Sequence, residues 1–414
     1  MTDDLMKSSG SGDADNSTHA DEQRLYPKVR FRGFDEPWKT KNVSSTFDII
    51  TDYVANGSFE SLRKNVVTYK SYNYAYMIRL QDASNNWQGP WLYTDKKGYN
   101  FLSKSKLFPG DIVMSNVGSV GLFYLIPDLG KPMTLAPNSI LLRSSFENNR
   151  FLFSLMNSNL IKTQIEKEKS PGAQPKINKT DFKKIKLVIP QRTEQNVIAN
   201  LFKVIDSLLS LQQRKLELES LLYKHLKRNC FYNNYNFYYS KPKKLNIKMK
   251  DIITLEDNQR IPVSENNRKK GITPYYGANG IQDYVDGYTH VGQYILIAED
   301  GASDIQNYPV IAVNGKVWIN NHAHVLKVNK TVDFSYLLYF LKNFNYFPWL
   351  VGSGRFKLNA KTLLNIKISI DSNTENQRKI GVLLNECDSL THATSTRIKL
   401  IKDIKQFLLQ NLFI

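Results

Sequence analysis

The chain has 414 residues, and its 56 lysines and arginines outnumber its 38 aspartates and glutamates to give a formal net charge of +18. With 41% hydrophobic and 12% aromatic residues it can bury real cores in more than one domain. It contains no apolar run of about 18 residues and no basic-then-apolar signal layout, so neither a membrane span nor export is indicated. The positive charge favours a polyanionic partner such as nucleic acid, with a merely basic protein as the alternative.

The cysteine content indicates the compartment. Only Cys230 and Cys387 occur, and they lie far apart in the sequence. A disulfide framework is therefore not expected, and the cytoplasm is the expected location.

The first half begins with a leader and continues into a strand-rich domain. Residues 1–27 are acidic and rich in Ser, Gly and Asp, which predicts disorder. Short alternating runs such as Val66–Leu80 and Asp111–Ile126, punctuated by Gly and Pro, are typical of strands and turns. A helical stretch and a glycine loop, Ser170–Lys176, follow. We expect the first domain to span residues 28–190.

A long helix is predicted over residues 191–231, because no Pro or Gly interrupts the stretch from Thr193 to Phe231. Two sets of positions recur every seven residues and predict a coiled-coil seam with two polar interruptions. They are Val197, Val204, Leu211, Leu218 and His225, and between them Leu201, Leu208, Lys215 and Leu222. A helix buried on a globular domain would explain the leucines alone about as well.

The second half repeats this order of events. Residues 232–372 contain a polar-aromatic linker and then short strands, tight turns, a helix and a second glycine loop, Gly352–Lys357. Residues 373–414 predict a second long helix. Both halves therefore read as a mixed, strand-rich domain that is closed by a long helix.

The similarity between the halves extends to the sequence itself. KINKTDFKKIKLVI from Lys176 matches KLNAKTLLNIKISI from Lys357, at an offset of 357 − 176 = 181. Thr193-Glu194 matches Thr374-Glu375 at this offset, and after one inserted residue the match resumes further along both helices. Such a repeat predicts two similar structural halves.

Catalytic motifs are not evident. The chain has no G-x-x-x-x-G-K-[ST] loop for ATP, no Asn/Asp-Pro-Pro-aromatic stretch of an amino-methyltransferase and no strand-borne glycine fingerprint. Asp128, Asp181 and Lys183 could be forced into a nuclease pattern. The repeat, however, replaces Asp181 and Lys183 by Thr362 and Leu364, which speaks against a shared catalytic role.

Two histidines could suggest a metal site. His322 and His324 would lie on one face of a strand. No thiol or acid cluster is near them in sequence, so a structural or DNA-contacting role is the favoured interpretation. No metal, catalytic or cofactor-binding residue is therefore predicted in this chain.

Residues suited to DNA recognition are present in both halves. Arg and Lys can neutralise phosphates and address guanine, Asn and Gln can address adenine, and glycine loops offer free backbone N–H groups beside a cation. The alternatives are solvated strand faces and plain turns. Candidates in the first half are Lys64, Tyr69, Lys70, Tyr72, Asn73, Tyr74, Arg79, Asn116, Ser170, Gly172, Gln174 and Lys176. Those in the second half are Arg268, Lys269, Lys270, Tyr275, Tyr276, Asn279, Gln282, Asn320, Asn321, His322, Gly352, Ser353, Gly354, Arg355 and Lys357.

The pattern resembles the specificity subunit of type I restriction-modification enzymes. The resemblance rests on PQRTEQNVIANLFKVID and TENQRKIGVLLNECD in the two helices, on TPYYGANGIQDYVDGY, YILIAEDGAS and INNHAHVLKV, and on the opening VRFRGFDEPWKTKNV. It covers nearly the whole chain from Val29. Asp371 in place of Pro190, the more polar second helix and the acidic leader depart from the family pattern.

The resemblance implies an α+β fold with two strand-rich target-recognition domains, separated by two long antiparallel helices that form a coiled coil in an internal pseudo-two-fold repeat. It implies a non-catalytic subunit that reads a bipartite double-stranded DNA target. It also implies two methylation subunits that use S-adenosylmethionine and two restriction subunits that use ATP and Mg²⁺, with no cofactor in this chain. A nuclease or methyltransferase acting alone, or a basic coiled-coil adaptor, are the rival interpretations.

Overall fold

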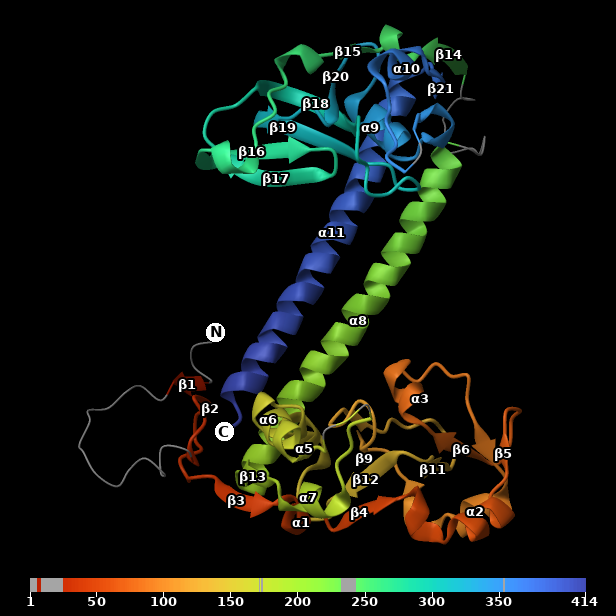
Figure 1. Ribbon diagram of the computed structural model, residues 1–414, viewed down its shortest axis with the longest axis vertical. Helices are drawn as coiled ribbons and strands as arrows, with labels where there is room; N and C mark the ends of the chain where they lie inside the picture. The colour runs from red at the N-terminus through yellow and green to blue at the C-terminus, as the bar shows by residue number, and fades with distance from the viewer. Residues whose placement is uncertain (1–5, 9–24, 171, 173, 232–242, 353) are drawn as a thin grey trace, which may run out of the picture. The chain divides into compact units, whose positions relative to one another are not determined.

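A computed structural model describes residues 6–8, 25–170, 172, 174–231, 243–352 and 354–414. The chain forms two compact units, Met1–Leu211 with Ile398–Ile414, and Gln212–Arg397 (Figure 1). Both long helices contribute to both units. Most of the expected leader and the start of the linker lie outside the described residues. Within the leader, strand β1 (Met6–Ser8) is described, and it pairs with β2 (Val29–Phe31).

Unit 1 is built on two sheets. The first has the order β10-β9-β12-β4 and is antiparallel throughout, with β4 Ile49–Asp52, β9 Ile112–Ser115, β10 Phe123–Leu125 and β12 Ser139–Arg143. The second has the order β5-β7-β6-β11-β8, with β5 Thr68–Tyr69, β6 Ala75–Ile78, β7 Tyr93–Thr94, β8 Lys106–Leu107 and β11 Met133–Leu135. A two-stranded ribbon joins β3 (Lys39–Asn42) to β13 (Lys186–Ile189).

Helices cover these sheets in unit 1. They are α1 Val43–Thr46, α2 Phe59–Asn65, α3 Leu80–Ser84, α4 Lys96–Phe101, α5 Asn149–Met156, α6 Asn159–Glu168 and α7 Lys179–Lys184. The main core joins strand residues such as Ile112 and Leu142 to Phe151 of α5 and to the ends of both long helices. The N-terminal ends of α5 and α6 follow a sequence signal: Asn148 and Ser158 cap free N–H groups of the first turns.

Unit 2 is built on one six-stranded sheet of order β15-β20-β18-β19-β16-β17. Within this sheet, as far as the structure describes it, β16 and β19 are parallel and the other neighbouring strands are antiparallel. The strands are β15 Ile253–Leu255, β16 Lys270–Gly277, β17 Gly280–Val285, β18 His290–Ala298, β19 Val310–Ile319 and β20 Ala323–Val328. A ribbon pairs β14 (Lys244–Lys248) with β21 (Lys367–Asp371). Helices α9 (Phe334–Lys342) and α10 (Ala360–Asn365) complete the unit.

The two predicted long helices are present as α8 (Arg192–Phe231) and α11 (Thr374–Asn411). In unit 1 the first part of α8 meets the last part of α11, where Lys405 donates to Asp206 at 2.7 Å. In unit 2 the last part of α8, with Leu226, shares a core with Ile380 and Leu384 of α11. The helices therefore run antiparallel, and the predicted fold class is confirmed.

The predicted seam of α8 is wrong in register. Val204, Leu211 and Leu218 are 64%, 68% and 51% exposed, whereas Ile198 and Phe202 are 1% exposed. The packed side of α8 follows the same heptad spacing one residue later: Ile198, Phe202, Ile205, Leu209, Gln212, Leu216, Glu219, Tyr223, Leu226 and Cys230. The helix thus carries two neighbouring apolar stripes, and the sequence pattern identified the exposed one.

A buried glutamine fixes each long helix to its domain. In unit 1 the Gln195 side chain accepts from the Asn148 amide at 3.0 Å and donates to the Pro190 carbonyl at 2.9 Å. In unit 2 Gln377 accepts from the Asp333 amide at 2.9 Å and donates to the carbonyl of Asp371. Because the two glutamines make the same contacts, Gln195 corresponds to Gln377, at an offset of 182. The one inserted residue of the second copy therefore lies before its long helix, and the Thr-Glu pairs do not correspond in the structure.

Cys230 is buried and Cys387 is partly buried. Among the described residues no helix is long and apolar enough to cross a membrane.

Candidate nucleic-acid interface

The glycine loop of unit 1 is docked onto the turn that follows β9. Ser170 and Lys176 close the loop through a backbone hydrogen bond of 2.9 Å. Lys176 forms a bridge with Val117, and Gly118 donates to the Pro175 carbonyl at 2.9 Å. The two loops therefore form one surface, and Gly118 has a φ of +76°, a conformation that glycine adopts without strain.

Unit 2 builds the same surface from different residues. Val351 and Lys357 exchange two backbone hydrogen bonds of 2.9 Å, and Lys357 bridges Asp300 as Lys176 bridges Val117. Gly301 has a φ of +77° and occupies the place of Gly118. The repeat therefore extends to the turns after β9 and β18, where the sequences of the two halves do not match.

A third segment joins this surface in unit 2. The side chain of Asn279, in the turn between β16 and β17, donates to the Gly301 carbonyl at 3.0 Å and accepts from the Ser303 amide at 2.8 Å. The 299–303 turn, which was not among the predicted candidates, thus brings together two that were, Asn279 and the glycine loop.

A network of charged side chains joins the 299–303 turn and the glycine loop of unit 2 to the rest of the unit. Glu299 pairs with Arg260 at 2.7 Å and with Lys357 at 3.1 Å, and Asp257 lies 2.6 Å from His324. Burial by itself would raise the pKa of both carboxyl groups. Hydrogen bonds from Arg260 and Lys357 to Glu299, and from His324 to Asp257, outweigh burial, so both pKa values are lowered.

This network also contains a group with metal-ligand chemistry. Ligand atoms of Asp257, Glu299 and His324 lie within 4.8 Å of one another. Each ring nitrogen of His324 already faces an oxygen, Nδ1 that of Asp257 at 2.6 Å and Nε2 the Leu358 carbonyl at 2.7 Å. Arg260 pairs with both carboxylates, so the donor set fits a charge-balanced support better than a cation site. His324 is buried within this support.

The aromatic candidates of unit 1 form a separate cluster on the five-stranded sheet. Tyr72 is 75% exposed, and the ammonium of Lys131 lies 3.1 Å from its ring centroid. Lys131 also donates to the Asn73 carbonyl at 3.1 Å. Sequence reasoning missed Lys131, because a single lysine in a turn gives no signal of the rings that fold over it. Lys64, Lys70 and Tyr74 are exposed on the same segment, and Tyr69 is partly buried.

Three candidates are engaged inside their own domains. Arg79 forms hydrogen bonds to Asp82 and at 2.6 Å to the Pro90 carbonyl. Tyr275 is 1% exposed, and the Arg268 guanidinium lies 4.3 Å from its ring centroid. In this structure these side chains hold loops of their own domains together.

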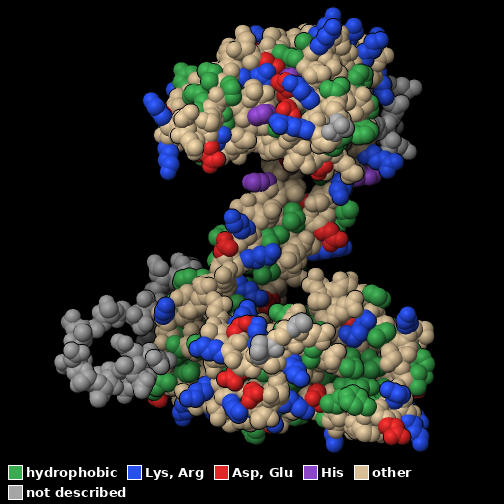
Figure 2. Space-filling model, in the orientation of Figure 1, with side chains coloured by type: hydrophobic (Ala, Val, Ile, Leu, Met, Phe, Trp, Pro, Cys, Tyr) green, Lys and Arg blue, Asp and Glu red, His purple; other side chains and the backbone are tan. Residues whose placement is uncertain are grey.

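The remaining candidates differ in exposure. Asn320 is 4% exposed and supports the His322 amide, while Asn116, Ser170, Tyr276 and His322 are partly buried. Ser353 lies outside the described residues. The exposed ones are Gly172, Gln174, Lys176, Lys269, Lys270, Asn279, Gln282, Asn321, Gly352, Gly354, Arg355 and Lys357. Figure 2 shows lysine and arginine side chains spread over the visible face of each unit, without a single dominant patch.

Comparison with known proteins follows the same division into halves. The family model of the type I restriction modification DNA specificity domain matches the chain twice, over residues 35–220 and 231–403. The chain belongs to this family. The two matches coincide with the two repeats, each including one domain and part of a long helix.

Individual relatives of this specificity family agree. A candidate type I restriction enzyme specificity subunit of Haemophilus influenzae is 40% identical over 145 residues, which are 35% of this chain and 37% of the relative. The EcoprrI specificity subunit of Escherichia coli is 26% identical over 141 residues, 33% of this chain and 34% of the relative. The alignments thus span only about a third of either relative.

A solved structure shows the same fold. The S subunit of a type I restriction-modification system from M. genitalium superposes with a TM-score of 0.65 at 17% identity, and the match covers 92% of this chain and 97% of that one.

Proposed function

We propose that this specificity-family chain binds double-stranded DNA at a bipartite target, each half of the target being read by one unit. The observation that carries the proposal is the repeated loop pair, in which Lys176 meets Val117 and Lys357 meets Asp300. Two equivalent surfaces on one chain suit two half-sites, while their different side chains suit two different sequences.

The long helices suit a fixed spacing between the half-sites. The 40 residues of α8 make a helix of about 60 Å at ~1.5 Å per residue. One extra base pair between the half-sites rotates one relative to the other by about 35°. Binding should therefore be intolerant of changes in the length of the unread gap.

The experiment begins by finding the target. Methylome sequencing of cells that carry the chain with its partner subunits should return a bipartite methyladenine motif. Binding is then measured on duplexes whose gap is lengthened or shortened by one base pair, with gaps of equal length and altered composition as controls. Equal affinity across all gap lengths would refute the bipartite mechanism.

We also propose the partners that the family resemblance implies. Two methylation subunits with S-adenosylmethionine and two restriction subunits with ATP and Mg²⁺ would perform the chemistry, and this chain would supply recognition. Incubation of the purified chain with DNA, Mg²⁺ and S-adenosylmethionine tests this division of labour. Cleavage or methylation without partners would favour the rival, an enzyme that acts alone.

The exposed apolar stripe of α8 supplies a surface for such a partner. Val204, Leu208 and Leu211 keep heptad spacing but face solvent in this chain, and Leu218 and Leu222 continue the spacing. A second heptad seam beside an occupied one is the arrangement that accepts a further helix. We propose that a helix of a methylation subunit packs there.

A further inference from the structure

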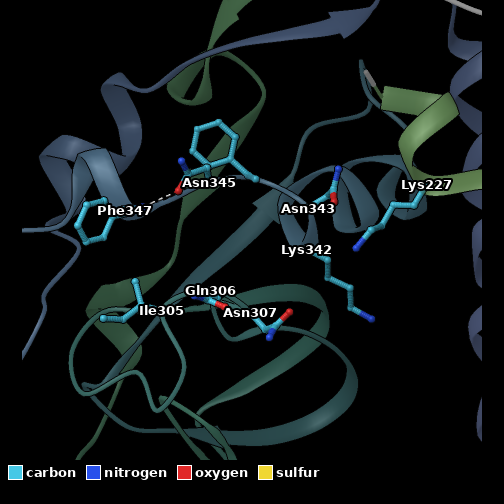
Figure 3. A pocket seen from close by; sticks show the side chains of 9 residues that line it. Lys227, Ile305, Gln306, Asn307, Lys342, Asn343, Asn345 and Phe347 are labelled. Carbon is cyan, nitrogen blue, oxygen red and sulfur yellow. Dashed lines mark hydrogen bonds between the residues drawn. The ribbon is translucent and has the colours of Figure 1, made fainter. Parts of the chain in front are cut away.

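Unit 2 contains a cationic pocket whose lining residues lie outside Asn279, the 299–303 turn and the glycine loop. Its volume is about 570 Å³, within the range of ligand sites. Lys227 reaches it from α8 and Lys342 from the last turn of α9, while Gln306, Asn307 and Asn345 add amide groups (Figure 3). No carboxylate is among the described residues that line it. The donors therefore suit an anion.

The two lysines differ in how they are balanced. Lys342 pairs with Asp388 at 3.1 Å, and the same carboxylate oxygen accepts from the Tyr339 hydroxyl at 3.2 Å. Lys227 is partly buried and has no ion-pair partner among the described residues. Its burial, and then the nearby charges of Lys224 and Lys342, lower its pKa. The Lys227 ammonium, 5.7 Å from the Tyr223 ring centroid, thus has no carboxylate counterion in the part of the chain that the structure describes.

The internal repeat shows that the fold does not require a lysine at the position of Lys227. At an offset of 182 along the long helices, Lys227 corresponds to Leu409, which packs against the core of unit 1. The helix caps Asn148 and Asp333 lie 185 residues apart, and by that offset Lys342 corresponds to Asn157. In unit 1 the counterpart of Asp388 is Asp206, which pairs with Lys405 and Arg150. A structural role therefore accounts for Lys342 but explains Lys227 poorly.

One loop connects the pocket to the candidate DNA surface. Residues 299–303 contact the glycine loop and Asn279, and Ile305, Gln306 and Asn307 of the same loop line the pocket. Both carboxylate oxygens of Asp304 accept hydrogen bonds from Gln306 and Asn307, so its charge is used within the turn.

We propose that this pocket binds a phosphate group of the DNA backbone beside the half-site read by unit 2. The proposal rests on the proposed function and adds to it a contact that only the second half makes. Ammonium and amide N–H groups are the donors that proteins direct at backbone phosphates. Such a contact positions the duplex without reading its sequence, and it releases bound cations, so it strengthens the salt dependence of binding.

The test replaces each lysine by its counterpart in unit 1, Lys227→Leu with Lys342→Asn, and uses Lys330→Ala as a matched surface control. Affinity of the full chain for its target duplex is measured from 50 to 200 mM salt. Loss of one phosphate contact should reduce the slope of log K against log salt by about 0.9, so wild-type affinity should fall about threefold more than that of the variant over this range. Lys330→Ala, at an exposed site, should lower affinity less than the double variant does, and it should keep the wild-type preference between half-sites.

The outcomes separate the two proposals. Wild-type chain that fails to prefer its target refutes the proposed function itself. If the wild-type chain prefers its target but the folded double variant keeps the wild-type slope of log K against log salt, the phosphate pocket alone is refuted. A slope that Lys330→Ala reduces equally refutes it as well. Tight binding of inorganic phosphate by wild-type chain, with no change in the DNA slope of the variant, would assign the pocket to a small anion instead. If the double variant unfolds, Lys227→Leu alone gives the same comparison.

Discussion

The exposed stripe of α8 gives a prediction whose size follows from the structure. Leu208 and Leu211 are 41% and 68% exposed. Full burial of a leucine side chain contributes roughly 1.5–3 kcal/mol, so a partner that covers the exposed fractions gains about 2–3 kcal/mol from the two residues together. Leu208→Ser with Leu211→Ser should therefore weaken binding of a methylation subunit by roughly 30- to 150-fold.

The same variant should leave the chain itself stable, because both side chains are exposed and neither belongs to a core among the described residues. The free energy of unfolding should change by less than about 0.5 kcal/mol per site. Isothermal titration calorimetry with the purified methylation subunit measures the affinity, and urea unfolding measures the stability. Gln213→Ser is the control for an exposed polar site on the same helix. Unchanged affinity would refute the docking surface, and a large loss of stability would show that the stripe is packed internally.

Three further predictions concern unit 2. Gln377→Leu removes the side-chain partner of the Asp333 amide and of the Asp371 carbonyl, so it should lower the free energy of unfolding in urea by about 2–4 kcal/mol. An unchanged urea midpoint would contradict this role of Gln377. Among the described residues, the buried carboxylate oxygens of Glu219 have no hydrogen bond and only a 3.6 Å ion pair with Lys215. Glu219→Leu should therefore raise stability by about 1–3 kcal/mol, and a lower thermal midpoint would argue against this. Because the pKa values of Asp257 and Glu299 are lowered from 3.8 and 4.5, their stabilisation is present above those values and is lost as pH falls through the folded pKa values. The stability difference between wild type and Glu299→Gln should therefore shrink on acidification, and a constant difference from pH 6 to 3 would refute the network.

The sequence predicted the long helices and the repeat because both leave periodic, redundant signals. The same periodicity failed to identify the packed face of α8. Ile198 and Ile205 pack, whereas Val197 and Val204, which have the same seven-residue spacing one residue earlier, are exposed. The inner stripe also contains Gln212 and Glu219, so its pattern looks weaker than that of the outer one. A helix with two apolar stripes cannot reveal by spacing alone which of them its own chain covers.

The candidate site was predictable only where local conformation determines it. Glycine loops and turn residues such as Asn279 depend on local conformation, and the structure brings them together. Cations beside aromatic residues are ambiguous, because a fold uses them internally as readily as at an interface. Arg79 and Arg268 are examples, since each holds a loop of its own domain. The pairing of Lys357 with Glu299 joins residues 58 positions apart in sequence (357 − 299 = 58), and no local pattern encodes it.

The ion pairs of the second glycine loop change how its charge should be counted. Arg355 contacts Asp300 at 2.7 Å and Lys357 contacts Glu299 at 3.1 Å, so these carboxylates act as internal counterions. A DNA phosphate that approaches either cation exchanges one anion for another and releases fewer salt ions than a free cation would. The first loop has Lys176 at the corresponding place beside Val117, which carries no charge. Two half-sites bound with similar geometry would therefore respond differently to ionic strength.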